Sequence, residues 1–469
     1  MKYVSTRGEA PRLGFEDVLL AGLARDGGLY VPAEWPRFTP EEIAGFAGAR
    51  YEDVAFAVMR PFMGDAVPAD ELRAMIEAAY AGFAHRSIAP LVEIAPNDWV
   101  LELFHGPTLA FKDVAMQVLA RLMDRTLDKR GERATIIGAT SGDTGGAAIE
   151  AFRGREAIDV FILYPHGRVS DVQRRQMTTP SEANVHAIAV KGTFDDCQNL
   201  VKAMFGDLAL RDRLGLTGVN SINWARLMAQ IVYFFSAAAS LGAPGRKMSF
   251  SVPTGNFGDV FAGYAACRMG LPVERLLIAT NVNDILARTL ASGRYEPRGV
   301  VATQSPSMDI QISSNFERLL FDLAGRDSAR VRALMAELNA EGRFVLTPAE
   351  IEGMRALFDA DRVDEAETVA TIRALASRTG YVADPHTAVG IAAAARKRGD
   401  RRVPMVMLAT AHPAKFPATV EAATGRAPPE PDIVARQRTA SERTVVLEND
   451  VTAVSGYVER HARSVGRTA

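Results

Sequence analysis

The chain has 469 residues, of which 48% are apolar and 23% charged, and its formal net charge is −2. These values are typical of a globular protein of two or three domains, and the balanced charge argues against a nucleic-acid partner. The N-terminus lacks the apolar stretch of a signal peptide, and the most apolar helical stretch, residues 231–242, is too short to span a bilayer, so we expect no membrane partner.

Residues 1–85 predict a helical N-terminal domain. Apolar residues recur with helical spacing at 15–23 and 70–76. The chain between them is interrupted by prolines, as expected for short helices joined by loops. With Cys197 and Cys267 as the only cysteines and no secretory context, we expect reduced thiols and a cytoplasmic protein.

Lys112 stands in an unusual local sequence, Phe-His-Gly-Pro-Thr-Leu-Ala-Phe-Lys-Asp, at residues 104–113. A lysine between an apolar run and a Gly-Pro turn is costly to bury unless it is paired or loses its charge. One way to lose the charge is to form a Schiff base with a carbonyl cofactor, above all pyridoxal phosphate. The alternative is an exposed lysine after a loop, which is where most lysines lie.

Two segments, 134–148 and 248–263, share one layout: an apolar run of strand character, a turn rich in Gly, Ser, Thr or Asn, and a run of helical character. Such turns place backbone N–H groups at a helix N-terminus, where anions bind favourably. Neither segment matches a nucleotide-binding fingerprint. One turn would suit a phosphorylated cofactor and the other an anionic substrate.

From about residue 90, predicted strands and helices alternate. The predicted strands are 134–139, 158–164, 185–190, 247–252, 275–280 and 403–409. The predicted helices are 145–153, 195–206, 224–241, 259–269, 315–324, 328–341, 367–379 and 386–398. This alternation predicts parallel sheets with helices on both faces, whose ligands bind at the carboxyl ends of the strands.

The remaining patterns offer little support for other chemistry. The seven histidines show no zinc-ligand spacing, so we expect no metal site. The basic run 396–402 follows a predicted helix and would complement the negative end of its dipole. A nucleic-acid-binding role for so short a run is disfavoured.

Several segments together resemble the threonine synthase family. Residues 104–113 are similar to its lysine motif, and 138–145 and 253–259 resemble its two loops. Further similar segments are 27–32, 305–310 and 409–416. These segments occur in order over most of the chain, which makes the resemblance far more specific than any one motif.

The resemblance implies a fold type II pyridoxal-phosphate enzyme of the α/β class. Two open parallel-sheet lobes with helices on both faces would form the catalytic region, residues 86–469, with the smaller lobe at roughly 112–200. A helical domain, residues 1–85, would precede them. Pyridoxal 5'-phosphate would be the cofactor.

The resemblance also implies roles for single residues. Lys112 would form the Schiff base and shuttle protons. Thr410 would face the pyridine nitrogen of the cofactor. The cofactor phosphate would lie in a cup formed by Gly255, Asn256, Phe257, Gly258 and Asp259. The substrate carboxylate would bind Ser141, Gly142, Asp143 and Thr144. Candidates for the substrate phosphate are Lys415, Arg226, Asn223 and Thr108.

Asp143 is the least certain of these assignments, because many relatives in the wider fold have asparagine there. A carboxylate cannot donate a hydrogen bond unless it is protonated. Its role is therefore left open by the sequence.

The implied reaction converts O-phosphohomoserine and water to threonine and phosphate. A lyase of the same class, which releases 2-oxobutanoate, ammonia and phosphate, would use the same lysine and loops. A non-catalytic binding protein is disfavoured, because Lys112 and the cup are intact. The sequence does not distinguish a monomer from a homodimer.

Overall fold

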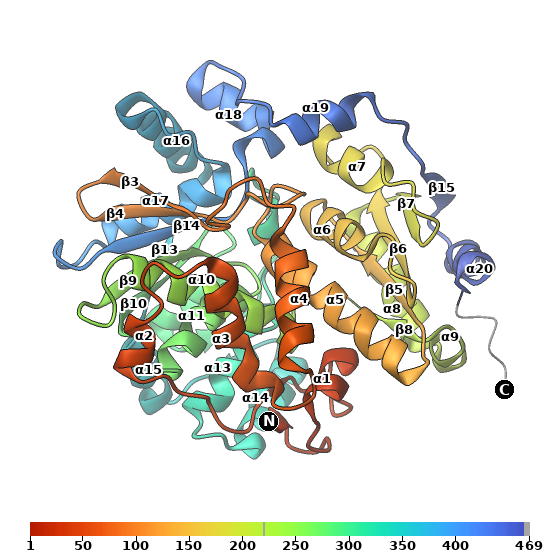
Figure 1. Ribbon diagram of the computed structural model, residues 1–469, viewed down its shortest axis with the longest axis horizontal. Helices are drawn as coiled ribbons and strands as arrows, with labels where there is room; N and C mark the ends of the chain where they lie inside the picture. The colour runs from red at the N-terminus through yellow and green to blue at the C-terminus, as the bar shows by residue number, and fades with distance from the viewer. Residues whose placement is uncertain (219–220, 464–469) are drawn as a thin grey trace.

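The computed structural model of the chain describes residues 1–218 and 221–463. In Figure 1 a six-stranded sheet lies on the left and a five-stranded sheet on the right. The N-terminal helices cover the front between them. Among the described residues, no helix combines the length and apolar character needed to cross a bilayer.

The N-terminal segment is mainly helical, and the predicted helices at 15–23 and 70–76 are confirmed as α1 and α4. Strands β1 and β2 pair antiparallel, with Val4 opposite Val31. Helix α3 buries Val54, Val58 and Phe62, which share one face at a spacing of four residues. The elements are β1 (Tyr3–Ser5), α1 (Phe15–Ala21), β2 (Tyr30–Pro32), α2 (Pro40–Ala44), α3 (Tyr51–Met63) and α4 (Ala69–Tyr80).

The larger sheet has the strand order β13-β10-β9-β14-β4-β3 and is parallel except for β3, which pairs antiparallel with β4. Its strands are β3 (Leu91–Ala95), β4 (Asp98–Glu102), β9 (Met248–Pro253), β10 (Val273–Thr280), β13 (Phe358–Arg362) and β14 (Met405–Ala409).

Both faces of this sheet are covered by helices. In β10, Leu276 and Ile278 belong to the core shared with α10 (Trp224–Ser240) and α11 (Gly258–Arg268). Leu277 and Ala279 point to the other side, into the core shared with α17 (Pro385–Arg396). This alternation buries every residue of the strand's second half, as parallel sheets require. Helix α16 (Glu365–Thr379) packs beside α17.

The smaller sheet is entirely parallel, with the strand order β15-β7-β6-β5-β8. Its strands are β5 (Ala134–Ala139), β6 (Ile158–Pro165), β7 (Val185–Lys191), β8 (Leu216–Thr217) and β15 (Val445–Glu448). The helices that accompany them are α6 (Asp143–Phe152), α7 (Asp171–Thr178), α8 (Phe194–Gly206) and α9 (Leu208–Leu214).

The C-terminal segment joins the two lobes. Helices α18 and α19 run across the top of Figure 1 from the larger sheet toward the smaller one, where β15 becomes an edge strand. The smaller sheet therefore includes β8 and β15, which lie outside residues 112–200. The elements of this segment are η2 (Pro413–Lys415), α18 (Pro417–Thr424), α19 (Asp432–Thr439), β15 and α20 (Val451–His461).

The longest helix, α5 (Lys112–Arg130), was not among the predicted elements. It lies between the lobes, and most of its residues are buried. Phe111 precedes it in a helical conformation and offers no side-chain cap, so the usual start signal is missing. The other elements are α12 (Ile285–Ser292), β11 (Arg294–Tyr295), η1 (Pro306–Met308), α13 (Phe316–Leu323), α14 (Ser328–Glu341), β12 (Phe344–Val345) and α15 (Pro348–Arg355).

Candidate active site

Lys112, the first residue of α5, lies where the two lobes meet. The backbone before it pairs with the chain that follows β14: Phe111 N donates to Thr410 O at 2.8 Å, and His412 N donates to Leu109 O at 3.0 Å. This pairing brings Lys112 close to Thr410, which is itself buried after the carboxyl end of β14. Burial lowers the pKa of Lys112, although Asp143 partly offsets the shift. A buried amine with a lowered pKa suits a Schiff-base lysine.

Asp143, the first residue of α6, faces two lysines. Its carboxylate oxygens lie 2.9 Å from Lys415 Nζ and 3.7 Å from Lys112 Nζ. Gln173 Nε2 donates to it at 2.9 Å. Burial alone would raise the pKa of Asp143, but Lys415 and Lys112 outweigh burial and hold it well below its ordinary value. Asp143 is therefore an ionised carboxylate that accepts hydrogen bonds.

Lys415 is fully buried and its ammonium has a complete set of acceptors. Besides Asp143, its Nζ donates to Thr108 O at 2.7 Å and to Gln176 Oε1 at 2.9 Å. An ammonium carries three protons, so these three contacts use all of them. The side chain thus ties the C-terminal segment to the lysine loop and to α7.

The loop that precedes α6 depends on a glycine. Gly142 has φ +143°, and a Cβ there would lie 2.3 Å from Gln173 Cδ. The Thr140 hydroxyl accepts from Gly142 N at 3.0 Å and from Gly145 N at 2.9 Å, which fixes the turn. Ser141 is exposed and Thr144 is half-buried, so both are open to a ligand at the start of α6.

The segment Gly255–Asp259, the predicted cup, lies between the end of β9 and the first turn of α11. A Cβ on Gly255 would lie 2.8 Å from Ser307 O, so only glycine allows the segment around residue 307 to approach this closely. Phe257 caps α11 with φ +61°. The first N–H groups of α11 have no partner within the helix, as at any helix start, and are directed at this cup.

Two buried side chains, Arg226 and Asp259 of the cup, have polar atoms without partners among the described residues, although the Tyr233 hydroxyl donates to the other oxygen of Asp259. Within the described part of the chain, Arg226 Nε and Nη1 and Asp259 Oδ2 have no hydrogen-bond partner. Burial lowers the pKa of Arg226 to about 10 and raises that of Asp259 to about 7. Arg226 lies in the first turn of α10, whose dipole also favours an anion. Unpaired buried charges are costly unless a ligand pairs with them.

The structure places the other predicted residues around this site, with their side chains already engaged. The Thr108 hydroxyl donates to Asp113 Oδ1 at 2.6 Å. Asn223 donates to Leu19 O at 2.9 Å and accepts from Ala225 N at 2.9 Å, which caps α10. Thr108 therefore holds the Asp113 carboxylate and Asn223 holds backbone groups, and their direct contact with substrate stays a prediction.

Some residues of the site were not predicted from the sequence. Gln173 and Gln176 of α7 hold Asp143 and Lys415, and Ser307 and His386 lie behind Lys112. Ser307 lies in segment 305–310, which resembles the family, but the sequence analysis assigned no role to this residue. Nothing in the sequence pairs α7 with the distant Lys415.

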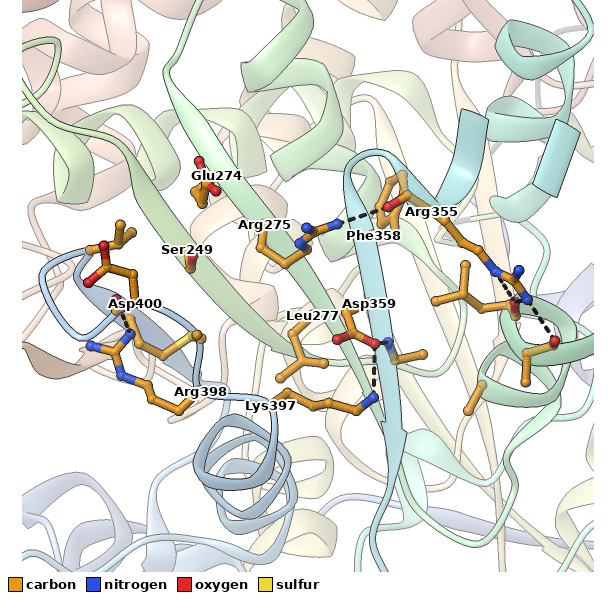
Figure 2. A pocket seen from close by; sticks show the side chains of 17 residues that line it. Ser249, Glu274, Arg275, Leu277, Arg355, Phe358, Asp359, Lys397, Arg398 and Asp400 are labelled. Atoms are coloured by element: carbon orange, nitrogen blue, oxygen red, sulfur yellow. Dashed lines mark hydrogen bonds and ion pairs between the residues drawn. The ribbon is translucent and has the colours of Figure 1, made fainter. Parts of the chain in front are cut away.

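A cleft of about 520 Å³ lies elsewhere in the described part of the chain. Figure 2 shows Ser249, Arg275 and Phe358 in its lining, which lie near the amino ends of β9, β10 and β13, opposite the ends that carry the site. Residues of α12 and of the loop 397–403 add to the lining. Lys397 pairs with Asp359 at 3.1 Å, and Arg398 with Asp98 at 2.8 Å. Arg275 donates to the carbonyl of Arg355, at the end of α15. Its charges are thus used within the fold, and we do not assign the chemistry to this cleft.

The residues at the carboxyl ends fit pyridoxal phosphate. The cup offers helix N–H groups to a phosphate, the unpartnered Arg226 lies beside it, and Lys112 offers a buried amine. The groups that would hold the cofactor are therefore Lys112, the cup and Thr410. Among the described residues, no cluster of His, Cys, Asp and Glu could hold a metal ion.

Comparisons with known proteins agree with this site. Residues 90–410 match the family described as pyridoxal-phosphate dependent enzyme, residues 2–80 the threonine synthase N terminus, and residues 387–458 the threonine synthase C-terminal family. Together these matches cover most of the chain.

Similar proteins include a threonine synthase of Pseudomonas aeruginosa, 54% identical over 98% of this chain and 98% of its own length. The structure of a threonine synthase from Brucella melitensis with bound pyridoxal phosphate is 60% identical, with a TM-score of 0.97, and covers 99% of this chain and 100% of that one. The yeast threonine synthase structure is 40% identical, with a TM-score of 0.94, over 98% of both chains. The chain is thus a member of the threonine synthase family of fold type II pyridoxal-phosphate enzymes.

Proposed function

We propose that the protein converts O-phosphohomoserine and water to threonine and phosphate. The observation that carries this proposal is the buried Lys112 amine, set between the start of α6 and a cup beside the unpartnered Arg226. The first offers a site for a carboxylate and the second a site for phosphate. Family membership supports the same reaction.

Bound pyridoxal phosphate would make the substrate's carbon-bound protons acidic, because its ring spreads the negative charge. Lys112 would take a proton from one carbon and deliver it at the next. The N–H groups of Gly255–Asp259 would bind the cofactor phosphate, and the Thr410 hydroxyl would face the ring nitrogen. A hydroxyl there leaves that nitrogen largely unprotonated.

The start of α6 would hold the substrate carboxylate through its N–H groups and the hydroxyls of Ser141 and Thr144. Asp143 would not touch that carboxylate, since two anions repel. We propose instead that Asp143 balances the charge of Lys112 from a fixed position. Lys415 and Gln173 keep it there and keep it ionised.

Arg226 is the best candidate for the substrate phosphate. A guanidinium binds phosphate through several N–H groups at once, and two of the nitrogens of Arg226 have no partner within the described residues. Lys415, Thr108 and Asn223 would contribute by holding the walls of the site, because their hydrogen bonds are already made. Phosphate is both a binding group and the leaving group in this proposal.

The experiment is to mix the purified holoenzyme with O-phosphohomoserine and to identify the products. Threonine and phosphate in equal amounts support the proposal. If 2-oxobutanoate, ammonia and phosphate are the main products, the protein is a lyase of the same class. Homoserine should be a far poorer substrate, because it lacks the group that Arg226 would bind. A cytoplasmic location and a monomeric or homodimeric state remain expectations from the sequence.

A further inference from the structure

Ser307, in the short helix η1, lies between Lys112 and its counter-ion. Its Oγ is 3.4 Å from Lys112 Nζ and 3.5 Å from Asp143 Oδ2. A hydroxyl has one proton to donate and two lone pairs that accept, so Ser307 can accept from the amine while it donates to the carboxylate. It thus joins two groups whose charged atoms are 3.7 Å apart.

Ser307 is held from behind by His386. The Ser307 N–H donates to His386 Nε2 at 3.2 Å, so that nitrogen carries no proton. The ring proton is therefore on Nδ1, which faces Asp384 Oδ2 at 2.7 Å. His386 and Asp384 are buried, and Asp384 also caps α17. These contacts fix the backbone of Ser307 relative to α17.

The loop that carries Ser307 is also fixed by Asp309. One oxygen of Asp309 accepts from Asn281 Nδ2 at 2.8 Å and the other from Thr303 N at 2.9 Å. Asn281 directly follows β10 in the larger sheet. These contacts hold the backbone on both sides of Ser307, so its hydroxyl is kept within 3.4 Å of Lys112 Nζ, as an efficient catalytic group requires.

We propose that Ser307 is a further catalytic residue, whose hydroxyl holds the Lys112 amine while it moves a proton between two substrate carbons, and that His386 is a positioning residue that acts through Ser307. When Lys112 takes a proton, a carbon–hydrogen bond breaks and a nitrogen–hydrogen bond forms. The Ser307 oxygen accepts a hydrogen bond from the resulting ammonium and keeps its own proton, directed at Asp143. The proton then passes from Lys112 to the next carbon, which restores the neutral amine.

The inference rests on the proposed function, and its first test compares Ser307→Ala with Ser307→Thr, which keeps a hydroxyl. We measure kcat and KM for O-phosphohomoserine, and the visible absorbance of the bound cofactor as a function of pH. Ser307→Ala should lower kcat about 10- to 100-fold with KM changed less than about threefold, and it should shift the absorbance titration. Ser307→Thr should retain most of kcat.

The titration reports on Lys112 because of the charges around that residue. The charged groups that act on Lys112 are Asp143, Lys415, Arg226, Asp113 and Asp259. All of them stay in place in the Ser307 variants, so a shift is due to the lost hydroxyl. A kcat within twofold of the parent together with an unchanged titration would overturn the proposal.

The second test concerns His386. In His386→Gln the amide oxygen can still accept from Ser307 N–H, whereas in His386→Leu it cannot. His386→Leu should lower kcat as Ser307→Ala does, and His386→Gln should restore much of it. Because His386 acts through Ser307, the double variant should be no slower than Ser307→Ala alone. If the loss of kcat in the double variant equals the product of the two single losses, His386 acts independently of Ser307 and this part of the proposal is wrong.

The role of Ser307 can be tested separately from the proposed reaction. If the parent makes no threonine, the proposed function fails, while the absorbance titration of Ser307→Ala still decides the role of Ser307. Circular dichroism and cofactor content show whether His386→Leu folds. If it does not fold, the comparison of Ser307→Ala with Ser307→Thr alone tests the role of Ser307.

Discussion

The two ends of the larger sheet differ in how their charges are satisfied. At the amino ends of the strands lies the cleft of about 520 Å³, and its Lys397 and Arg398 pair with carboxylates (Figure 2). At the carboxyl ends, Arg226 and Asp259 are buried and each has polar atoms without a partner within the described residues. The cleft at the amino ends is thus lined by charges that the fold already pairs with its own groups.

This difference shows which feature marks the site. A folded chain rarely leaves buried polar groups unpaired, so where such groups gather around Lys112, as Arg226 and Asp259 do, they indicate that a ligand completes the structure. Cavity size alone carries no such information, since a surface cleft can be lined by paired charges. We therefore expect substitutions at the carboxyl ends to alter function and those at the amino ends to leave it almost unchanged.

The largest effect should come from Lys112→Ala at the carboxyl end. Removal of the amine should abolish the visible absorbance of covalently bound cofactor and lower kcat at least about 10³-fold, because no other amine can replace it. Borohydride reduction of the parent followed by peptide mapping should place the modified lysine at 112. A modified lysine at any other position would contradict the assignment, and circular dichroism checks that the variant folds.

Next in size is Gly255→Ala, compared with Gly258→Ala in the same cup. The new Cβ at 255 would lie 2.8 Å from the Ser307 carbonyl oxygen, and the backbone there must shift. Overpacking of this kind costs about 1–3 kcal/mol, so cofactor affinity should fall about 10- to 100-fold. At 258 the nearest atom is the Asn315 side-chain nitrogen at 3.3 Å, which can move, so that loss should be smaller. Dialysis followed by cofactor titration measures both, and equal losses would show that close approach at 255 is unimportant.

Arg226→Met tests the unpartnered guanidinium directly. If Arg226 binds the substrate phosphate, KM for O-phosphohomoserine should rise about 10- to 100-fold, the range expected for lost hydrogen bonds to a charged group. Inhibition by inorganic phosphate should weaken in parallel. Arg402→Met, whose side chain is 91% exposed, provides the control and should match the parent. An unchanged KM and unchanged phosphate inhibition would exclude Arg226 from the phosphate site.

Sequence analysis proposed residues that the structure brings together around Lys112, because motifs and strand ends are local features. Lys112, the cup and Thr410 follow from short segments, and the predicted strands 134–139 and 185–190 correspond to β5 and β7. Residues 104–113 also showed Lys112 in an unusual setting, with an apolar run and a Gly-Pro turn nearby. Neighbouring residues along the chain are enough for predictions of this kind.

Long-range contacts could not be predicted in this way. Lys415 is held by Gln176 and Asp143, which lie more than 200 positions earlier in the chain. Strand β15 returns to the smaller sheet after the whole larger lobe has been built. Helix α5 lacks a capping residue, and its burial on nearly all sides weakens the periodic pattern by which helices are found. In each case the deciding partner lies far away in the sequence.

Thr410 should give a smaller and graded effect. Thr410→Ser keeps the hydroxyl and should stay within about threefold of the parent kcat, since at most one weak contact changes. Thr410→Asp would favour a protonated ring nitrogen, so it should change the cofactor's absorbance spectrum and lower kcat about tenfold or more. The spectra and the steady-state rates are recorded on the same preparations. Equal rates and spectra for all three proteins would place Thr410 away from the ring.

The smallest effect should come from Lys397→Ala in the cleft at the amino ends. Lys397 and Asp359 pair at 3.1 Å, but each side chain is 38% exposed, so water and salt screen the pair. Loss of such a pair changes the free energy of unfolding by about 0–1 kcal/mol, and kcat/KM should stay within about twofold of the parent. Urea unfolding and steady-state kinetics measure the two quantities. The cleft is one strand length from the cup, because β9 begins at the first and ends at the second. A tenfold loss of kcat/KM with unchanged stability would therefore mean that the amino and carboxyl ends of the larger sheet are coupled through its strands. Function would then depend on residues at both ends.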